Sequence, residues 1–178
     1  MQNYRTNLNE YKWESFYQEF QEESPRAAVI LAGAFLDTLL TDLLTSFMIE
    51  NDRAVDELLG KTKNFEDTVT SSFAAKIKIS YCLGIISNIE YHDLNRIKNI
   101  RNRFSHEIHG YSFENNDIIK NCNELEIPKK FLEIIPEILN TCQGKFIFTV
   151  SQLLMRLGIR ILEVQKERRV TRKNEPFI

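Results

Sequence analysis

Residues 87–106 read SNIEYHDLNRIKNIRNRFSH and carry the clearest helical signal in the chain. Ser87 followed by Glu90 has the spacing of a capping box, in which each side chain satisfies a backbone N–H group at the start of a helix. After it, long or apolar side chains recur at spacings of three and four residues, at Leu94, Ile97, Arg101, Phe104 and Ile108. This period predicts one helix from residue 87 onward, with Arg101 on the seam that faces the rest of the protein.

Helical patterns also fill the sequence on both sides of this segment. The first predicted helix has an aromatic stripe, made of Trp13, Phe16, Tyr17 and Phe20. Further helices are predicted over about 25–49, 52–59, 73–83, 115–125 and 145–169. Only 6 glycines and 4 prolines occur among 178 residues, which favours long helices with few tight turns. We therefore expect an all-α fold, a single bundle of four to six helices.

Local signals mark where these helices begin and end. Ser24-Pro25 is typical of an N-cap followed by proline in the first turn, and Gly60 is typical of a helix stop. Ser71 or Ser72 is the expected cap of the 73–83 helix, after a polar loop over residues 61–70. We expect one domain over 1–178, with a core over 10–125, an irregular or hairpin-like excursion over 126–143, a C-terminal core helix over 144–169 and a basic tail over 170–178.

The charge balance limits the classes of partner. The formal net charge is −2 and the pI is about 6.0, which argues against a protein that binds duplex DNA through a basic face. The positive charge is uneven, because residues 166–173 read KERRVTRK. Such a run is typical of a solvated helix end and tail, and nucleic-acid contact is the alternative.

Cysteine usage and hydropathy indicate a cytoplasmic protein. Cys82, Cys122 and Cys142 are odd in number and lack CxxC spacing, so we expect reduced, mostly buried thiols and neither a disulfide framework nor a metal site. The first ten residues lack the apolar segment of a signal peptide. No window approaches eighteen uninterrupted apolar residues, which argues against a membrane span. No glycine-rich phosphate loop or other cofactor motif is present.

The end of the central helix carries the best candidate for chemistry. Residues 101–106 read RNRFSH and place Arg101, Asn102 and His106 within little more than one helical turn. Arginine holds a phosphate through two parallel hydrogen bonds, and histidine transfers protons near neutral pH. These are the groups that RNA cleavage without a metal requires, with Asn102 as an orienting amide.

The spacing leaves a structural interpretation open. Arg101 and His106 lie about 140° apart around an ideal helix, so they converge only at the helix end or across a symmetric dimer. Otherwise Arg101 pairs with a carboxylate, and His106 is a cation favoured at a helix C-terminus. Further candidates for binding are Arg103, His109 and Asp37. Asp37 and Asp42 interrupt an apolar stretch and are either on a polar face, which we favour, or paired.

Several stretches around the central helix form a recognisable set. They are residues 73–79 (FAAKIKI), 81–87 (YCLGIIS), Leu94 and residues 97–106, with 32–37 (AGAFLD) before them and 111–113 (YSF) after them. In these stretches the chain resembles the mannitol-operon repressor (MltR) family. The similarity covers about residues 24–125. That family is thought to belong to the wider HEPN superfamily, whose shared mark is an arginine followed by a polar residue and, four to six residues later, a histidine. Arg101, Asn102 and His106 match that mark.

The resemblance implies helical architecture, a homodimer and one of two functions. The first is a regulator of a sugar-alcohol-type operon that acts through a protein partner, since no helix-turn-helix is evident. The second is a metal-independent endoribonuclease of a toxin or defence system, in which Arg101 holds the scissile phosphate of RNA and His106 transfers the proton. We favour the first. Two copies are expected to bring the guanidinium and the imidazole to a common cleft.

Overall fold

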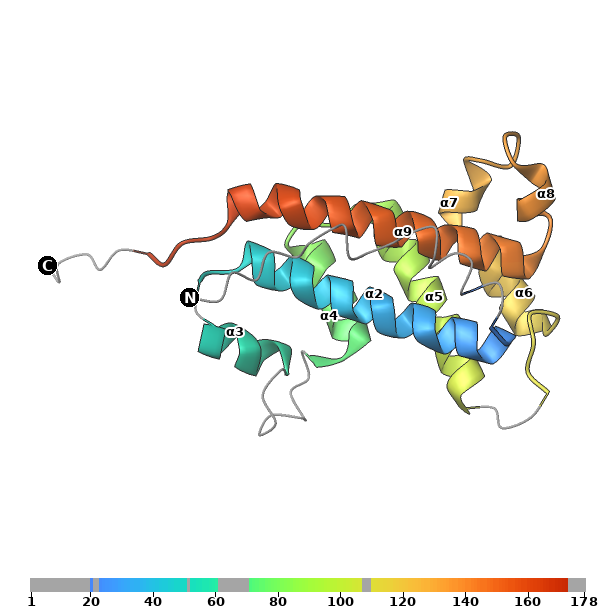
Figure 1. The fold of residues 1–178 in the computed structure, drawn as a ribbon, viewed down its shortest axis with the longest axis horizontal. Helices are drawn as coiled ribbons and strands as arrows, with labels where there is room; N and C mark the ends of the chain where they lie inside the picture. Colours follow the sequence, from blue (N-terminus) through green and yellow to red (C-terminus); the bar gives the residue numbers. More distant parts are fainter. Residues whose placement is uncertain (1–19, 21–22, 51, 61–70, 107–109, 173–178) are drawn as a thin grey trace, which may run out of the picture.

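The computed structural model describes residues 20, 23–50, 52–60, 71–106 and 110–172. Every regular element in these ranges is helical, which confirms the predicted all-α class (Figure 1). The elements are α2 (Pro25–Phe47), α3 (Asp52–Leu59), α4 (Phe73–Cys82), α5 (Asn88–His106), α6 (Asn116–Asn123), α7 (Glu126–Lys129), α8 (Pro136–Leu139), α9 (Cys142–Val164) and the 3₁₀ helix η3 (Gln165–Glu167). The predicted 10–22 helix, apart from buried Phe20, and the 61–70 loop lie outside the described residues.

α2 is the central helix of the bundle. Ser24 accepts a hydrogen bond from the backbone N–H of Ala27 (3.2 Å), and Pro25 occupies the first turn, as the sequence predicted. α2 packs against α4, α5 and α9, and it runs beside α9 in the same direction (Figure 1). It is apolar and long enough to cross a membrane, but half of its most apolar window is buried in the molecule. Contacts with three other helices account for that composition without a membrane.

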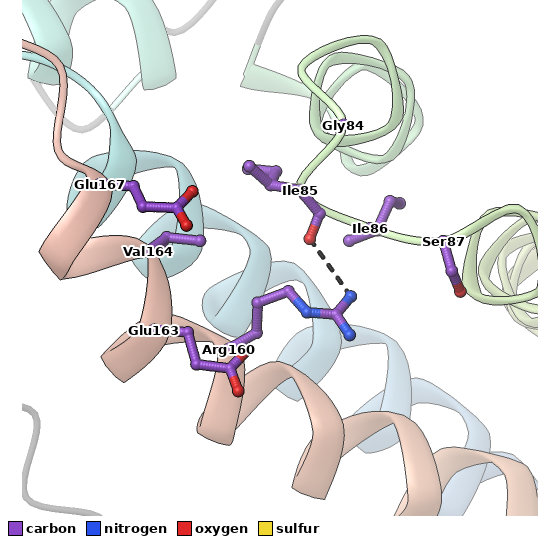
Figure 2. Close-up of a pocket in the computed structure, with 8 residues that line it drawn as sticks. All are labelled: Gly84, Ile85, Ile86, Ser87, Arg160, Glu163, Val164 and Glu167. Carbon is purple, nitrogen blue, oxygen red and sulfur yellow. Dashed lines mark hydrogen bonds between the residues drawn. The ribbon is translucent and has the colours of Figure 1, made fainter.

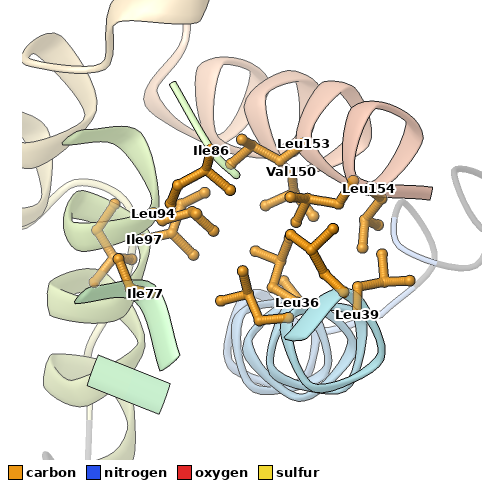
Figure 3. Close-up of a cluster of buried hydrophobic side chains, with 14 of the residues drawn as sticks. Leu36, Leu39, Ile77, Ile86, Leu94, Ile97, Val150, Leu153 and Leu154 are labelled. Carbon is orange, nitrogen blue, oxygen red and sulfur yellow. The ribbon is translucent and has the colours of Figure 1, made fainter. Parts of the chain in front are cut away.

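The core lies where α2, α4, α5 and α9 meet. Each of these helices presents leucine, isoleucine or valine side chains to it (Figure 3). The labelled members are Leu36 and Leu39 of α2, Ile77 of α4, Ile86 of the α4–α5 turn, Leu94 and Ile97 of α5, and Val150, Leu153 and Leu154 of α9. Burial of one such side chain contributes about 1.5–3 kcal/mol. This shared core fixes α5 in place between its neighbours.

The segment between α6 and α9 differs from the hairpin-like or irregular excursion that we predicted. It contains two one-turn helices, α7 and α8, so the described residues hold eight α-helices instead of four to six. The first of these turns is capped from a distance. The carboxylate of Asp93 in α5 accepts hydrogen bonds from the backbone N–H groups of Glu126 and Ile127, both at 2.8 Å. A cap 33 residues away in sequence leaves no local signal.

Two of the three cysteines are paired, contrary to the expectation of reduced thiols. Cys122, at the end of α6, forms a disulfide with Cys142, at the start of α9. The bond therefore closes the segment that holds α7 and α8. Cys82 is free, and it is exposed instead of buried. The sequence did not indicate this pairing because it depends on how α6 packs against α9.

α9 is shifted toward the N-terminus relative to the predicted 145–169. It begins at Cys142 because Thr141 caps it, accepting a hydrogen bond from the backbone N–H of Gly144 (2.9 Å). It ends at Val164, where η3 follows. The apolar period starts only at Phe146, so the first turn was not recognised from the pattern.

The basic run after α9 is not simply a solvated tail. Arg168 donates from Nη2 to the backbone oxygen of Thr45 (3.2 Å). The Arg169 guanidinium lies 4.8 Å from the centroid of the Phe47 ring, and the Arg169 N–H donates to the Phe47 oxygen (2.9 Å). Cations are favoured at a helix C-terminus and over an aromatic face. These two arginines therefore hold the chain after η3 against the end of α2.

Candidate functional site

α5 carries the motif formed by Arg101, Asn102 and His106. The predicted capping box fixes its start: the Ser87 N–H donates to Glu90 Oε2 (2.7 Å), and the Glu90 N–H donates to Ser87 Oγ (3.3 Å). The apolar face of α5 packs against α2, α4 and α9. The cap and the packed face together set the rotation of the helix, and hence the direction in which the motif points.

Arg101 passes over α2 at a glycine. A Cβ atom at Gly33 would lie 2.9 Å from Arg101 Cγ, closer than side chains normally pack. Gly33 is buried, whereas Arg101 is exposed. Glycine at this position lets the aliphatic part of Arg101 lie against α2 while the guanidinium reaches solvent. This explains how a charged residue occupies the predicted seam of α5.

The three motif side chains do not all meet. Arg101 Nη1 donates to Asn102 Oδ1 (3.3 Å). His106 is exposed in the last turn of α5, and within the described ranges no hydrogen bond joins it to Arg101. Nor does Arg101 form an ion pair with any described carboxylate, so that part of the structural interpretation is not observed. The position of His106 at the helix C-terminus does fit that interpretation.

The secondary binding candidates have structural partners. Arg103 Nε lies 3.3 Å from Asp117 Oδ2, and the Tyr111 hydroxyl donates to the same oxygen. Arg103 therefore ties the end of α5 to α6. His109 lies outside the described residues.

Asp37 is paired, which corrects our preference for a solvated carboxylate. Lys76 Nζ lies 3.0 Å from the Asp37 carboxylate, and the Lys76 side chain is only 7% exposed. Asp42 is half-buried as well. The Asp37–Lys76 pair links α2 to α4, so Asp37 has a structural role in the bundle.

A single chain does not bring the groups of the motif to one place. The Arg101 guanidinium is exposed, lacks an acidic partner in the described ranges and is able to hold a phosphate or carboxylate. His106 is able to transfer a proton, but it lies about 140° away around the helix. A second molecule would have to supply the remaining geometry. No cluster of three or more His, Cys, Asp or Glu residues suited to a metal ion occurs among the residues that the structure describes.

A pocket of about 330 Å³ lies at the other end of α5. Figure 2 shows the α4–α5 turn, residues 84–87, on one side of it and the C-terminal half of α9 with η3 on the other. The α9 and η3 side is formed by Arg160, Glu163, Val164 and Glu167.

Arg160 has two partners at this pocket. Its Nη1 donates to the backbone oxygen of Ile85 (3.3 Å) and to Glu90 Oε2 (2.6 Å). The ion pair links α9 to the capping box of α5, so the guanidinium is engaged in the fold. Glu163 and Glu167 supply the remaining charge on the pocket wall, and that charge is negative.

Two buried carboxylates on α5 have pKa values that shift in opposite directions. Burial alone would raise the pKa of Glu90, but hydrogen bonds from Ser87 and the charge of Arg160 hold it below its usual range. Burial raises the pKa of Asp93, and the two backbone N–H groups at the start of α7 only partly offset this. Glu90 is therefore stabilised as an anion, whereas burial penalises the charged form of Asp93.

Sequence reasoning missed three residues that position the motif: Gly33, Asp93 and Arg160. Each is polar or small on a face that is otherwise apolar. Asp93 lies beside Leu94 and three residues after Glu90, on the side of α5 that the apolar period marks as buried. Polar residues at such positions indicate specific partners, although they do not identify those partners.

Comparisons with known proteins agree with this architecture. The family model described as MtlR, mannitol repressor, matches residues 19–152. A similar solved structure is the X-ray structure of the MtlR–HPr complex from Escherichia coli, with a TM-score of 0.62 and 16% identity, covering 82% of this chain and 97% of that chain. No match was found among curated proteins. At this identity, the structural likeness shows the fold alone.

Proposed function

Because the chain belongs to the mannitol repressor family, we propose that it is a regulator of a sugar-alcohol-type operon that acts in the cytoplasm through protein contacts. The observation that carries this proposal is the match of the family model over residues 19–152, a range that includes the four helices of the core in whole or in part.

The structure supports protein contacts over direct reading of duplex DNA. α4 and α5 are consecutive helices joined by a short turn, which is the arrangement that a helix-turn-helix would need. However, α5 is packed into the core, with Leu94, Ile97 and Phe104 fully buried. Arg160 also ties the start of α5 to α9. This packing fixes one face of α5, whereas His92, Asn99 and Arg103 are exposed on the other. The net charge of −2 gives the chain no overall attraction for phosphate, which argues against binding through a basic face.

HPr is the partner that we propose first. The similar Escherichia coli structure is a complex of MtlR with HPr, and the aligned region covers 97% of the matched chain in that structure. Exposed apolar side chains on the described helices provide surfaces that a protein partner could cover. The HPr of the same cell is therefore the protein to test.

Two measurements test the proposal together. Isothermal titration calorimetry of the purified chain with HPr from the same genome should show saturable binding. Deletion of the gene should raise expression from a mannitol-type operon reporter. An electrophoretic shift of the operator DNA by the purified chain alone, at physiological salt and with sequence specificity, would contradict a mechanism through protein contacts.

A metal-independent endoribonuclease is the second candidate function. It is favoured by the exposed Arg101 guanidinium, whose hydrogen bond goes to Asn102 and not to a carboxylate. In this mechanism Arg101 stabilises the phosphate of RNA, and His106 from a second copy transfers the proton. The chain would be incubated with total RNA in EDTA, beside an Arg101→Ala, His106→Ala double variant. Cleavage of RNA by the natural chain but not by the double variant would establish this activity. Identical RNA profiles after incubation with the two proteins would eliminate it.

A further inference from the structure

The outward face of α9 carries an apolar stripe that is open to solvent. Met155 (41% exposed), Ile159 (49%) and Leu162 (41%) follow one another at spacings of four and three residues. Half-buried Phe148 extends the stripe toward the start of the helix. The opposite face of α9 lies in the core, and α9 runs along one edge of the bundle (Figure 1). An apolar stripe with this period is the usual contact face of a helix pair.

Charges of opposite sign flank the stripe on one side. Arg156 and Glu163 are both exposed, and neither has an ion-pair or hydrogen-bond partner in the part of the chain that the structure describes. Seven residues separate them, which is nearly two helical turns, so they project from the same side of α9 about 10.5 Å apart. They are too far apart to pair with each other.

We propose that α9 pairs antiparallel with α9 of a second copy, about a two-fold axis near Ile159. Positions 156 and 163 lie at almost equal distances on either side of that axis. The rotation therefore brings Arg156 of each copy beside Glu163 of the other, which gives two equivalent ion pairs at the edges of an apolar seam. Self-complementarity of this kind is what a two-fold interface requires.

The acidic pocket adds an independent feature at the same place. Glu163 and Glu167 line its α9 side (Figure 2). Arg160 cannot neutralise both of them, because its guanidinium already binds Glu90 and the backbone oxygen of Ile85. Arg156 of the second copy reaches the rim of this pocket and supplies the missing positive charge. A parallel pair would instead place Arg156 and Glu163 of the two copies on opposite edges of the seam, where they do not meet.

This interface is separate from the proposed regulatory and ribonuclease functions. The motif with Arg101 and His106 is at the C-terminal end of α5, away from α9 (Figure 1). The α9 pair leaves that end free. Failure of the dimer would not change the case for operon regulation, and failure of HPr binding would not change the case for the dimer.

Sedimentation equilibrium of the full chain tests the proposal. The natural chain should be a dimer at micromolar concentration, and Ile159→Asp should be a monomer with an unchanged circular dichroism spectrum. Arg156→Glu and Glu163→Arg should each raise the dimer Kd about tenfold. The combined Arg156→Glu, Glu163→Arg variant should restore the natural Kd, because the exchange recreates both ion pairs.

Cross-linking tests the orientation and does not depend on the stability of the aspartate variant. In a Cys82→Ser background, Ile159→Cys should form a disulfide-linked dimer under mild oxidation, whereas Gln152→Cys, farther from the two-fold axis, should not. A monomeric natural chain at about 100 µM would overturn the proposal, as would cross-linking of both cysteines or no restoration by the charge exchange. A chain that is monomeric alone but loses HPr binding in the α9 variants would assign the stripe to HPr instead.

Discussion

Replacing Arg160 with methionine should lower the free energy of unfolding at pH 7 by about 3 kcal/mol. Arg160 donates to Glu90 at 2.6 Å, and the Glu90 side chain is 1% exposed. Methionine keeps most of the volume of the arginine stem but leaves a buried carboxylate with only the hydrogen bonds from Ser87. Breaking a buried pair from one side costs about 3–5 kcal/mol, and the partial exposure of Arg160, 26%, places the expected value at the lower end.

The loss of unfolding free energy caused by Arg160→Met should depend on pH, because the ion pair between Arg160 and Glu90 requires a charged Glu90. In the natural chain the pKa of Glu90 is lowered, so its contribution is fully present above the ordinary glutamate pKa of about 4.3 and is lost as the pH falls through the folded value. Without Arg160, the pKa of Glu90 should be higher than in the natural chain, because the charge and hydrogen bond that help to lower it are gone. The difference in unfolding free energy between the two proteins should therefore be largest near neutral pH. It should shrink as the pH falls below about 4.3 and through the lowered folded pKa, where Glu90 becomes protonated in the natural protein as well.

Urea unfolding monitored by circular dichroism at several pH values measures this difference. Lys78→Met is the matched control, because Lys78 is exposed on α4 and has no ion pair among the described residues. The control should change the free energy of unfolding by less than about 0.5 kcal/mol. A cost below about 1 kcal/mol for Arg160→Met, or a cost that does not vary with pH, would refute the role assigned to this pair.

Three further changes have defined expected outcomes. Cys122→Ser, or dithiothreitol, should lower the unfolding free energy by about 3 kcal/mol in thermal or urea unfolding, since the disulfide spans 20 residues; equal stability with and without reductant would contradict the bond. Gly33→Ala should cost no more than about 2 kcal/mol, because better helix propensity offsets overpacking. It should also reduce any ligand binding that Arg101→Ala abolishes, since its Cβ displaces Arg101. Asp93→Asn should cost about 1–3 kcal/mol in urea unfolding, because an amide has only one acceptor for two N–H groups. The pKa of Asp93 is raised, so its contribution to the free energy of unfolding is fully present below pH 3.9, roughly the ordinary aspartate pKa, and is lost as the pH rises through the folded pKa. The difference in unfolding free energy between Asp93→Asn and the natural protein should therefore narrow as the pH rises over that range.

Helix boundaries were predictable from the sequence where a residue close to the boundary determines them. Ser24 caps α2, Ser87 and Glu90 form the capping box of α5, and Gly60 follows α3 with a φ of +71°. In each case the residue that decides the structure lies within four positions of the backbone group it satisfies or the helix it ends. The apolar period then identifies the faces that form the core, because burial follows the helical repeat.

Features that depend on contacts between residues far apart in the sequence were not predictable. α7 depends on Asp93, and the disulfide depends on the packing of α6 against α9. Arg168 contacts Thr45, 123 residues away. Asp37 was expected in solvent because its partner, Lys76, is 39 positions later. Composition and period carry no information about which of several possible partners the fold brings close.

The candidate site shows the same division. The motif itself was recognised from residues 101–106, and its position at the end of a helix was predicted correctly. The exposure of the Arg101 guanidinium was not predicted, because the pattern places that residue on the buried seam. It depends on Gly33, a residue on another helix that lacks the side chain which would otherwise block the arginine stem.

The polar contacts of α5 also determine how the motif is presented. A helix with only apolar contacts is able to rotate or slide slightly within its groove, because burial is not directional. α5 is fixed near its start by two directional contacts, Glu90 with Arg160 and Asp93 with the α7 backbone. His106 lies sixteen residues after Glu90, about 24 Å along the axis, so a rotation permitted at the start turns Arg101 away from Gly33 at the other end. Variants at Arg160 or Asp93 that remain folded should therefore alter any ligand binding that depends on Arg101, although neither residue is near it.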